Sequence, residues 1–399
     1  MGNKQKIMVL GAGIYQVPLI RTARAMGLET IVVSYPGAYP GFAEADRVLY
    51  LDTTDVEGVC AAAQAERIAG IVTTGTDVAV RSLGHTCDVL GLSGITEQAA
   101  RVVTDKALMK QAMLDGGVAT SPFAVVSSLD EAYDAAESLG YPVMIKACDV
   151  SGSRGVSKVA QKELLADAYK AAQEATKKDY VVVEGFVEGH EIGVDAYVQE
   201  GKVRLFAPHD KFVSRFGHVT VPSGHAFPLT GDAGLHERVL EQLRRCVEAT
   251  GINNCAVNGD FMVCPDGSVK VIEIGGRCGA TCIPELISLH LGIAYYQAMI
   301  EGALGGNPNL APTTNVPCMA KLLFSDVTGR VVRIDEAALD DVQRASGADI
   351  LLDVREGDLV HCAHNGTDRW GQVIMATDSE AKLDAVLARV RACVELANE

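Results

Sequence analysis

The sequence lacks several features that would assign it to a particular cellular environment. None of its apolar runs approaches the length that spans a bilayer, so no membrane segment is expected. Positive charge is in deficit, because 35 Lys and Arg stand against 51 Asp and Glu, which gives a net charge of −16. A surface this acidic repels phosphate backbones, and we therefore expect no nucleic-acid partner. A small phosphate-bearing ligand is not excluded, because a local site can be basic within an acidic protein.

Paired cysteine motifs are also missing. The eleven cysteines include no CxxC pair, and Cys278 and Cys282 have no histidine at zinc spacing. This pattern is typical of reduced cysteines that serve as small hydrophobic residues in a cytoplasmic protein. Residues 1–6 lead directly into a strand and glycines, without the apolar segment of a signal peptide, so a cytoplasmic location is expected.

Two common nucleotide-binding signatures are incomplete or absent. The Walker pattern GxxxxGK[ST] does not occur. The first glycine loop, residues 11–16, has Gln16 where a dinucleotide fingerprint requires its third glycine, and the next strand ends in Ser34 rather than an acidic residue. Nicotinamide binding is therefore disfavoured, although the N-terminus of the following helix can still hold some anionic ligand.

The length of 399 residues predicts two or three domains. Strands alternate with helices in the first part of the chain, which predicts an N-terminal doubly wound parallel α/β domain over residues 1–118. In such a sheet Gly11, Gly13 and Asp77 would face one crevice at the carboxyl ends of the strands. Asp77 can equally cap the helix that follows it. The predicted strands cover 6–13, 30–33, 47–50 and 70–73, and the predicted helices cover 14–26, 55–65, 78–90 and 96–112.

The middle of the chain carries a lysine and a loop of small residues. Lys146 interrupts the apolar strand 141–146, and residues 148–156, CDVSGSRGV, follow it. Small residues let backbone N–H groups approach phosphate oxygens, and Arg154 adds positive charge, although such a loop can also be a mobile surface turn. The strand 180–184 then leads through a short linker to the strand 192–198, and such a linker can present backbone groups to an adenine edge.

A β-hairpin is predicted between residues 256 and 274. Its two alternating apolar segments flank Pro265-Asp266-Gly267, a turn with glycine placed for a positive φ. The hairpin sets Asp260 and Glu273 on neighbouring strands, where two carboxylates can bind Mg²⁺. Arg277 follows in a glycine-rich loop and can hold an anion with its forked guanidinium. An acidic surface hairpin with a flexible loop is the alternative.

The ordered set of these segments resembles the ATP-grasp superfamily, in particular its biotin-carboxylase-like branch. The resemblance is carried by Lys106, by Ile-Lys before Gly-Ser-Arg-Gly-Val, by Val-Glu-Gly-Phe-Val-Glu-Gly-His-Glu, by Gly-His-Ala-Phe-Pro, and by Asp260 with Glu-Ile-Gly-Gly-Arg. It extends over nearly the whole chain and is closest in motifs to amino-acid and carboxylate–amine ligases. It implies an ATP-grasp domain at 119–308, with a lid subdomain at about 123–184, and a C-terminal β-rich domain with a closing helix at 309–399.

The resemblance also implies roles for individual residues, with ATP and Mg²⁺ as cofactors. The implied nucleotide site comprises Lys106 and Lys146 on the phosphates, the lid residues Ser151, Gly152, Ser153, Arg154, Gly155 and Val156, the adenine hinge Glu184, Phe186 and Val187, and Glu191 on the ribose. The implied catalytic centre comprises Asp260 and Glu273 on Mg²⁺, Arg277 on the carboxylate substrate, His225 near the phosphates, and Lys211 with Arg215 on the γ-phosphate or substrate.

One residue departs from the pattern of the family. Where the family commonly has Glu-x-Asn, with the asparagine as a further metal ligand, this chain has Glu273-Ile274-Gly275, so a second metal ion is less secure. No lysine lies in an Ala-Met-Lys-Met setting, so a carried biotin is not indicated, and Trp370 is expected in the core or a cleft wall.

The resemblance implies an ADP-forming ligase that activates a small carboxylate as an acyl phosphate and joins it to an amine. A purine-pathway or bicarbonate-activating enzyme of the same fold is an alternative, for which a basic cluster near residues 11–16 would be expected. A nucleotide-binding regulatory module without catalysis is another. A homodimer is the usual assembly in this family.

Overall fold

The computed structural model describes residues 4–152, 154–216 and 219–398 of the chain. These residues form two compact units. The first unit contains Met1–Ala207, Gly231–Ala280 and Ala294–Leu310, and the second contains Pro208–Thr230, Thr281–Ile293 and Ala311–Glu399. Within the described residues, no helix combines the length and the apolar character that crossing a bilayer requires.

The first unit begins with a four-stranded parallel sheet in the order β3-β2-β1-β4. Its strands are β1 (Lys6–Leu10), β2 (Glu29–Ser34), β3 (Arg47–Tyr50) and β4 (Gly70–Val72), and its helices are α1 (Val17–Ala25), α2 (Val56–Glu66) and α3 (Val80–Leu90). This confirms the predicted N-terminal parallel α/β fold. The strand order reverses between β1 and β4, so the loops after these two strands flank the crevice where open sheets of this kind bind ligands.

Two helices differ from the sequence prediction. The segment expected to start a helix at Ile14 begins as a 3-10 turn over Ile14–Gln16, and α1 follows it. The helix expected over 96–112 is two helices, α4 (Glu97–Val103) and α5 (Lys106–Asp115). The break falls at Asp105, whose carboxylate accepts hydrogen bonds from the backbone N–H groups of Ala107 and Leu108. Aspartate is favoured in this position because its side chain satisfies a helix start better than a helix interior.

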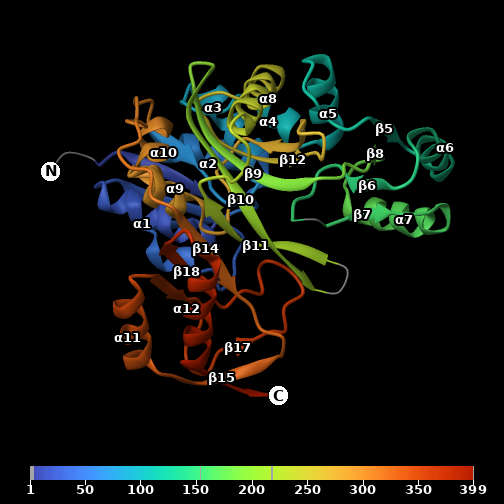
Figure 1. Cartoon of the computed structure of the whole chain (residues 1–399). Coiled ribbons are helices and arrows are strands. Elements are labelled where there is room, and N and C mark those ends of the chain that lie inside the picture. The colour runs from blue at the N-terminus through green and yellow to red at the C-terminus, as the bar shows by residue number, and fades with distance from the viewer. Residues whose placement is uncertain (1–3, 153, 217–218, 399) are drawn as a thin grey trace. The chain divides into compact units, whose positions relative to one another are not determined.

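The region expected to be the lid contains a separate antiparallel sheet in the order β5-β8-β6-β7. Its elements are β5 (Phe123–Val126), α6 (Leu129–Leu139), β6 (Val143–Ala147), β7 (Val156–Val159), α7 (Leu165–Ala175) and β8 (Val181–Gly185). Helices α6 and α7 lie together beside these strands, as Figure 1 shows. Their apolar faces and the sheet share one buried core that includes Ala136, Ile145 and Leu165.

The predicted hairpin is confirmed. Its strands β12 (Cys255–Val263) and β13 (Val269–Gly275) pair antiparallel, and β9 (His190–Gln199) pairs with the other edge of β12. Gly267 has a φ of 80° in the turn, a conformation that glycine adopts without a steric penalty. The helices α8 (Leu235–Thr250) and α10 (Tyr295–Ala303) complete this unit.

Strand β10 (Lys202–Phe216) passes from the first unit into the second. The second unit is rich in strands, as predicted for the C-terminal part. Its main sheet has the order β10-β11-β14-β18-β16, and a smaller sheet has the order β17-β15-β19. Its elements are β11 (Val219–Phe227), α9 (Ile283–Leu291), β14 (Cys318–Leu323), β15 (Gly329–Ile334), α11 (Glu336–Ser346), β16 (Asp349–Leu352), β17 (Leu359–Val360), β18 (Gly371–Ala376), α12 (Glu380–Ala392) and β19 (Val394–Asn398).

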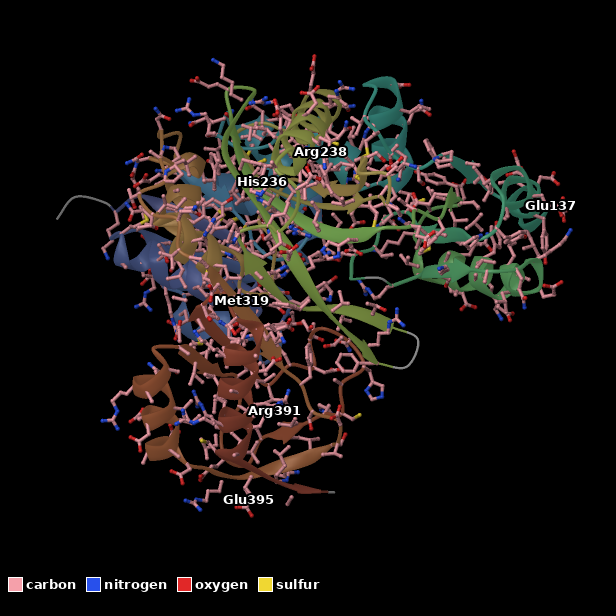
Figure 2. The ribbon with its side chains drawn as sticks, viewed as in Figure 1. Glu137, His236, Arg238, Met319, Arg391 and Glu395 are labelled. Carbon is pink, nitrogen blue, oxygen red and sulfur yellow. The ribbon has the colours of Figure 1, made fainter. Side chains whose placement is uncertain are left out.

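The closing helix is shorter than predicted. The sequence predicts one closing helix over residues 379–396, but α12 ends at Ala392 and the following residues pair as β19 with β15. The alternating Val394 and Leu396 pack into the core of the second unit, which favours a strand over a further helical turn. Trp370 lies in the same core with 5% of its surface exposed, and the guanidinium of Arg391, labelled in Figure 2, lies 5.8 Å from its ring.

Candidate functional site

A pocket of about 440 Å³ in the first unit collects charged side chains from five parts of the chain. These parts are the end of the parallel sheet with α3, the start of α5, the loop between β6 and β7, the segment after α7, and the hairpin with the loop after it. The polar and charged residues that line it include Thr54, Asp77, Arg81, Lys106, Asp149, Ser151, Arg154, Lys177, Asn258, Glu273 and Arg277.

The two hairpin carboxylates lie opposite each other. Asp260 and Glu273 are direct partners in the β12–β13 register, with an irregularity in the pairing just after Asp260. Directly paired residues of an antiparallel ladder place their Cβ atoms about 5 Å apart. In the described part of the chain, no three His, Cys, Asp or Glu residues converge as a metal site. Two carboxylates on adjacent strands fit a Mg²⁺ ion that takes its other oxygens from a phosphate ligand and water.

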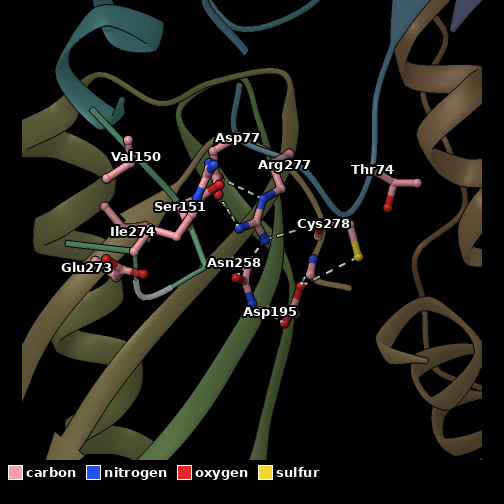
Figure 3. A network of polar contacts seen from close by, with 12 residues as sticks. Thr74, Asp77, Val150, Ser151, Asp195, Asn258, Glu273, Ile274, Arg277 and Cys278 are labelled. Atoms are coloured by element: carbon pink, nitrogen blue, oxygen red, sulfur yellow. Dashed lines mark hydrogen bonds and ion pairs between the residues drawn. The ribbon is translucent and has the colours of Figure 1, made fainter. Parts of the chain in front are cut away.

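Arg277 is held by a fork of two hydrogen bonds. Its Nε and Nη2 donate to the two carboxylate oxygens of Asp77, at 2.8 and 2.7 Å (Figure 3). Asp77 does not cap α3, whose N-cap residue is Ala79. The loop that carries Asp77 is fixed independently, because Gly75 N–H donates to the carbonyl of Cys278 at 3.1 Å. The structure therefore settles the two alternatives for Asp77 in favour of the crevice.

The other side of Arg277 belongs to a buried relay. Its Nη1 donates to Asn258 Oδ1 at 2.7 Å, and Asn258 Nδ2 donates to Asp195 at 2.9 Å. Asp195 also accepts from the backbone N–H of Gly279 at 2.9 Å. Figure 3 shows Asn258 beside the guanidinium and Asp195 beyond Asn258. The relay fixes the plane of the guanidinium relative to the pocket.

For both Asp195 and Arg277, burial shifts the pKa in one direction and the neighbouring polar or charged groups shift it in the other. Complete burial raises the pKa of Asp195 to about 6, although the N–H of Gly279 and the amide of Asn258 partly offset this. Burial alone would lower the pKa of Arg277, but the carboxylate of Asp77 outweighs it and holds that pKa above its usual value. Arg277 is therefore a permanent cation.

Lys106 connects three of the segments around the pocket. It is the first residue of α5, its Nζ donates to the carbonyl of Val150 at 2.9 Å, and the same nitrogen lies 3.8 Å from a carboxylate oxygen of Glu273. Its side chain thus reaches both the lid loop and a carboxylate expected to bind metal. This position is suitable for a contact with phosphate groups. A phosphate ligand bound there would contact both this lysine and a metal ion.

Lys146 and Glu184 lie in a buried ion cluster outside the lining of this pocket. Lys146 pairs with one carboxylate oxygen of Glu184, and Lys110 lies 2.8 Å from the other. Lys110 also donates to Thr120 Oγ1 at 2.7 Å. Burial alone would raise the pKa of Glu184, but the two lysines hold it below its usual value, whereas burial lowers the pKa of Lys110.

The remaining expected hinge residues line a second pocket, of about 240 Å³, between β8 and the 139–142 turn. Phe186 is 38% exposed, its N–H donates to the carbonyl of Pro142, and the Nζ of Lys158 lies 3.6 Å from the centre of its ring. Val187 is buried beside it. The structure thus brings Phe186 and Val187 together, apart from the residues that line the larger pocket.

The expected lid residues follow β6. Ser151 and Arg154 line the larger pocket, and the Nε of Arg154 donates to the carbonyl of Ser151 at 3.2 Å. Gly152 and Gly155 have φ values of 71° and 63°, and β7 begins at Val156. Ser153 lies outside the described residues.

Four expected site residues lie elsewhere, one of which is Arg215, opposite Thr220 in the β10–β11 register of the second unit. Glu191 lies on β9, opposite Met262 of β12. Lys211 and His225 belong to the second unit, where they are direct partners in the β10–β11 register. His225 is 3% exposed, and its ring centre lies 4.7 Å from that of His209. Burial lowers the pKa of His225 well below its usual value, so its imidazole is neutral at pH 7 and offers a hydrogen bond rather than a charge.

Several residues of these clusters were not identified from the sequence. Lys110 is one turn along α5 from Lys106, and this i, i+4 spacing was the only local signal for it. Asn258 and Asp195 carry no motif, and the partner of Arg277, Asp77, is 200 positions away in the chain.

Comparisons with known proteins agree with this arrangement. A family model described as an ATP-grasp domain matches residues 139–285. Uncharacterized protein y4rH of Sinorhizobium fredii is 26% identical over 394 residues, which cover 93% of this chain and 78% of that protein. Two longer curated relatives are matched over only 17% and 27% of their own length.

Solved structures match over the whole chain. Phosphoribosylglycinamide synthetase from Anaerococcus prevotii has a TM-score of 0.80 at 28% identity, with 100% of both chains covered. L-amino acid ligase from Bacillus licheniformis also has a TM-score of 0.80 with 100% of both chains covered, but at 16% identity, which shows the fold alone. Residues 139–285 therefore match an ATP-grasp domain, and the chain as a whole shares its fold with solved structures that include a biotin carboxylase domain.

Proposed function

We propose that this protein is an ATP-dependent, ADP-forming ligase that joins a small carboxylate of the amino-acid type to an amine through an acyl phosphate. The observation that carries the proposal is the convergence of Lys106, Glu273 and Arg277, together with the lid residues Ser151 and Arg154, on one pocket. These groups supply positive charge for phosphates, a carboxylate for a metal ion and an anchor for a substrate anion within one cavity.

The reaction needs activation because a free carboxylate has no leaving group that an amine can displace. Transfer of the γ-phosphoryl group of ATP to the carboxylate would give an acyl phosphate and ADP, and attack by the amine would then release phosphate. In phosphoryl transfer the protein contributes mainly position and charge. Bound between Asp260 and Glu273, Mg²⁺ would neutralise the negative charge on the phosphates.

The chain's own residues would act as follows. Lys106 and Lys146 would hold phosphates, and the lid residues 151–156 would exclude water, which otherwise hydrolyses the intermediate. Arg277, kept protonated and fixed in plane, would orient the substrate carboxylate toward the γ-phosphate. Residues 119–308 would constitute the ATP-grasp domain of the enzyme.

A phosphoribosyl substrate is the second candidate, favoured by the 28% identity to phosphoribosylglycinamide synthetase. The first glycine loop speaks against it. The amide of Gln16 donates to the carbonyl of Thr74, and atoms of that side chain lie 3.0 and 3.1 Å from where a Cβ would stand on Gly11 and Gly13. The space beside these glycines, where a phosphate could approach the backbone, is therefore filled by a neutral side chain.

The test is ADP release from Mg-ATP with a panel of amino acids, supplied singly and in pairs. We expect ADP and phosphate with a particular pair, and hydroxamate when hydroxylamine replaces the amine, because hydroxylamine traps an acyl phosphate. Stoichiometric ADP formation with a phosphoribosyl amine, and none with any pair of amino acids, would transfer support to the second candidate. ATP binding without turnover on any substrate would favour a regulatory module.

Two variants place the reaction in this pocket. Glu273→Gln removes a carboxylate expected to bind metal, and we expect it to lower ADP release by at least about 100-fold. Glu174→Gln is the matched control, because Glu174 is exposed on α7 and makes only a 3.9 Å ion pair with Lys170. Equal turnover by wild type and Glu273→Gln would show that this site assignment is wrong.

A further inference from the structure

We propose that Asp77 is the residue that selects the substrate, by accepting hydrogen bonds from an ammonium group next to the carboxylate that is activated. The substrate would then be an amino acid in its zwitterionic form rather than a simple carboxylic acid. This inference rests on the proposed function and names a determinant within the same pocket.

The first step in the argument is a count of donors on Arg277. A guanidinium has five N–H groups. Two donate to Asp77, one to Asn258, and one to the carbonyl of Cys278 at 3.3 Å. One N–H, on Nη2, is left for a ligand. Arg277 therefore cannot grip a substrate carboxylate with a two-pronged contact while Asp77 stays in place.

The second step concerns charge. Asp77 and Arg277 form a neutral pair, so a carboxylate that met only this pair would gain the attraction of the arginine and suffer the repulsion of the aspartate. A zwitterion avoids that repulsion, because its ammonium group can lie against Asp77 while its carboxylate takes the remaining N–H of Arg277. The ammonium group then faces the carboxylate of Asp77, and the substrate carboxylate faces the guanidinium of Arg277.

The third step is that Asp77 has free acceptor capacity and is open to the pocket. A carboxylate has about four lone-pair sites, and Arg277 uses two of them. The side chain of Asp77 is 28% exposed against 15% for that of Arg277, and both residues line the 440 Å³ pocket. Asp77 is thus the more accessible partner, and an ammonium group can reach it without breaking the pair.

The fourth step is that the backbone near the Asp77–Arg277 ion pair leaves space for the side chain of Asp77. A Cβ on Gly275 would stand 3.0 Å from Oδ1 of Asp77, closer than most Cβ contacts in proteins. The φ of Gly275 is not in the left-handed region, so glycine is needed here for space and not for conformation. The lack of a side chain at position 275 therefore makes room for the Asp77–Arg277 ion pair.

The experiment compares an amino acid that the wild-type enzyme uses with the matching carboxylic acid that lacks the amino group. Both are assayed for ADP release at neutral pH with wild type and with Asp77→Asn, an isosteric change that removes the charge. The loop should keep its position, since Gly75 and Cys278 join it by backbone. Asp115→Asn, at the exposed end of α5, is the matched control.

For wild type we expect KM to be at least about 10-fold lower for the amino acid than for the des-amino acid, since a charged hydrogen bond is at stake. Asp77→Asn loses one arm of the Arg277 fork for both substrates, but it should raise KM for the amino acid by about 10-fold or more beyond any rise in KM for the des-amino acid. Gly275→Val, which crowds Asp77 without altering any polar group, should shift the preference in the same direction.

Two results would overturn the assignment of Asp77. One is a wild-type enzyme that uses both acids equally well, a comparison that needs no variant to fold. The other is an Asp77→Asn enzyme whose KM rises equally for both acids, since this would show that Asp77 only supports Arg277. If the wild type releases no ADP with any carboxylate, the ligase proposal fails and this inference fails with it.

Discussion

The buried ion cluster of Lys110, Lys146 and Glu184 predicts an unusual mutational pattern. The three side chains have 1%, 8% and 3% of their surface exposed, and together they carry one net positive charge. Glu184→Gln removes the only anion and leaves two lysines facing a neutral amide. Loss of one partner from a buried ion pair typically destabilises a protein by about 3–5 kcal/mol, because the remaining charge is uncompensated.

Lys110→Met should be much milder. It leaves Glu184 paired with Lys146 and costs mainly the 2.7 Å contact of Lys110 with Thr120, so we expect a loss of about 1–3 kcal/mol. The decisive variant combines both changes. Glu184→Gln with Lys110→Met restores a net charge of one and removes one of the two lysines that face the amide, leaving Lys146. We therefore expect the double variant to be more stable than Glu184→Gln alone.

The midpoint of urea unfolding measures these effects, and hydrogen exchange of the β6 and β8 amides shows whether the change is local. Lys146 and Glu184 lie on these two paired strands, so exchange should increase there first. The wild type, the two single variants and the double variant form a double-mutant cycle. We expect a coupling energy that makes the double variant more stable than the sum of the two single losses predicts. Additive losses, with the double variant the least stable of the four, would refute the charge argument.

Three further predictions concern other parts of the first unit. Because burial raises the pKa of Asp195 from 3.8 to about 6, its stabilising contribution is complete below pH 3.8 and is lost as pH rises to about 6. The stability of wild type relative to Asp195→Asn should therefore fall by about 3 kcal/mol across this range, and a constant difference in urea titrations would contradict it. Gly302→Ala should destabilise the protein by at least about 1–3 kcal/mol, because the new Cβ would stand 1.6 Å from the hydroxyl oxygen of Tyr197. Adding Tyr197→Phe, which removes that oxygen, should recover part of the lost melting temperature. If it recovers none, the strain lies elsewhere. Chelation of Mg²⁺ should abolish ADP release. Glu273→Gln should raise the Mg²⁺ concentration that gives the half-maximal rate by about 10-fold or more. An unchanged Mg²⁺ dependence would show that Glu273 is not a metal ligand.

Features that depend on short stretches of chain were predictable from the sequence. The Pro265-Asp266-Gly267 turn fixes which residues of the hairpin face each other, so the pairing of Asp260 with Glu273 followed from spacing alone. The parallel sheet followed from the alternation of strands and helices. The break before α5 had a local signal in Asp105, but the apolar pattern on both sides obscured it.

Features that depend on distant residues were not predictable. No local pattern connects Asp77 to Arg277 across 200 positions, or Lys110 to Glu184 on another element. A lysine on a helix is usually solvated, and only the packing of α5 against β8 places Lys110 in the interior. Burial of this kind depends on how the elements pack, and the sequence alone does not determine that packing.

The departure at position 275 illustrates how such a contact changes the meaning of a motif. From the sequence, the family resemblance implies an asparagine metal ligand at position 275, so Gly275 is interpreted as the loss of that ligand. In the structure, Oδ1 of Asp77 would lie 3.0 Å from a Cβ at this position, so any larger side chain would compete with Asp77 for the space beside Arg277. Gly275 therefore has a structural consequence of its own, because it leaves space for the carboxylate of Asp77, from the loop after β4, to enter the pocket beside Arg277. If the substrate is a zwitterion, the carboxylate of Asp77 provides a negative group for its ammonium directly beside Arg277, the anchor for its carboxylate. The same departure at position 275 that weakens the case for a second metal ion then strengthens the case for an amino-acid substrate.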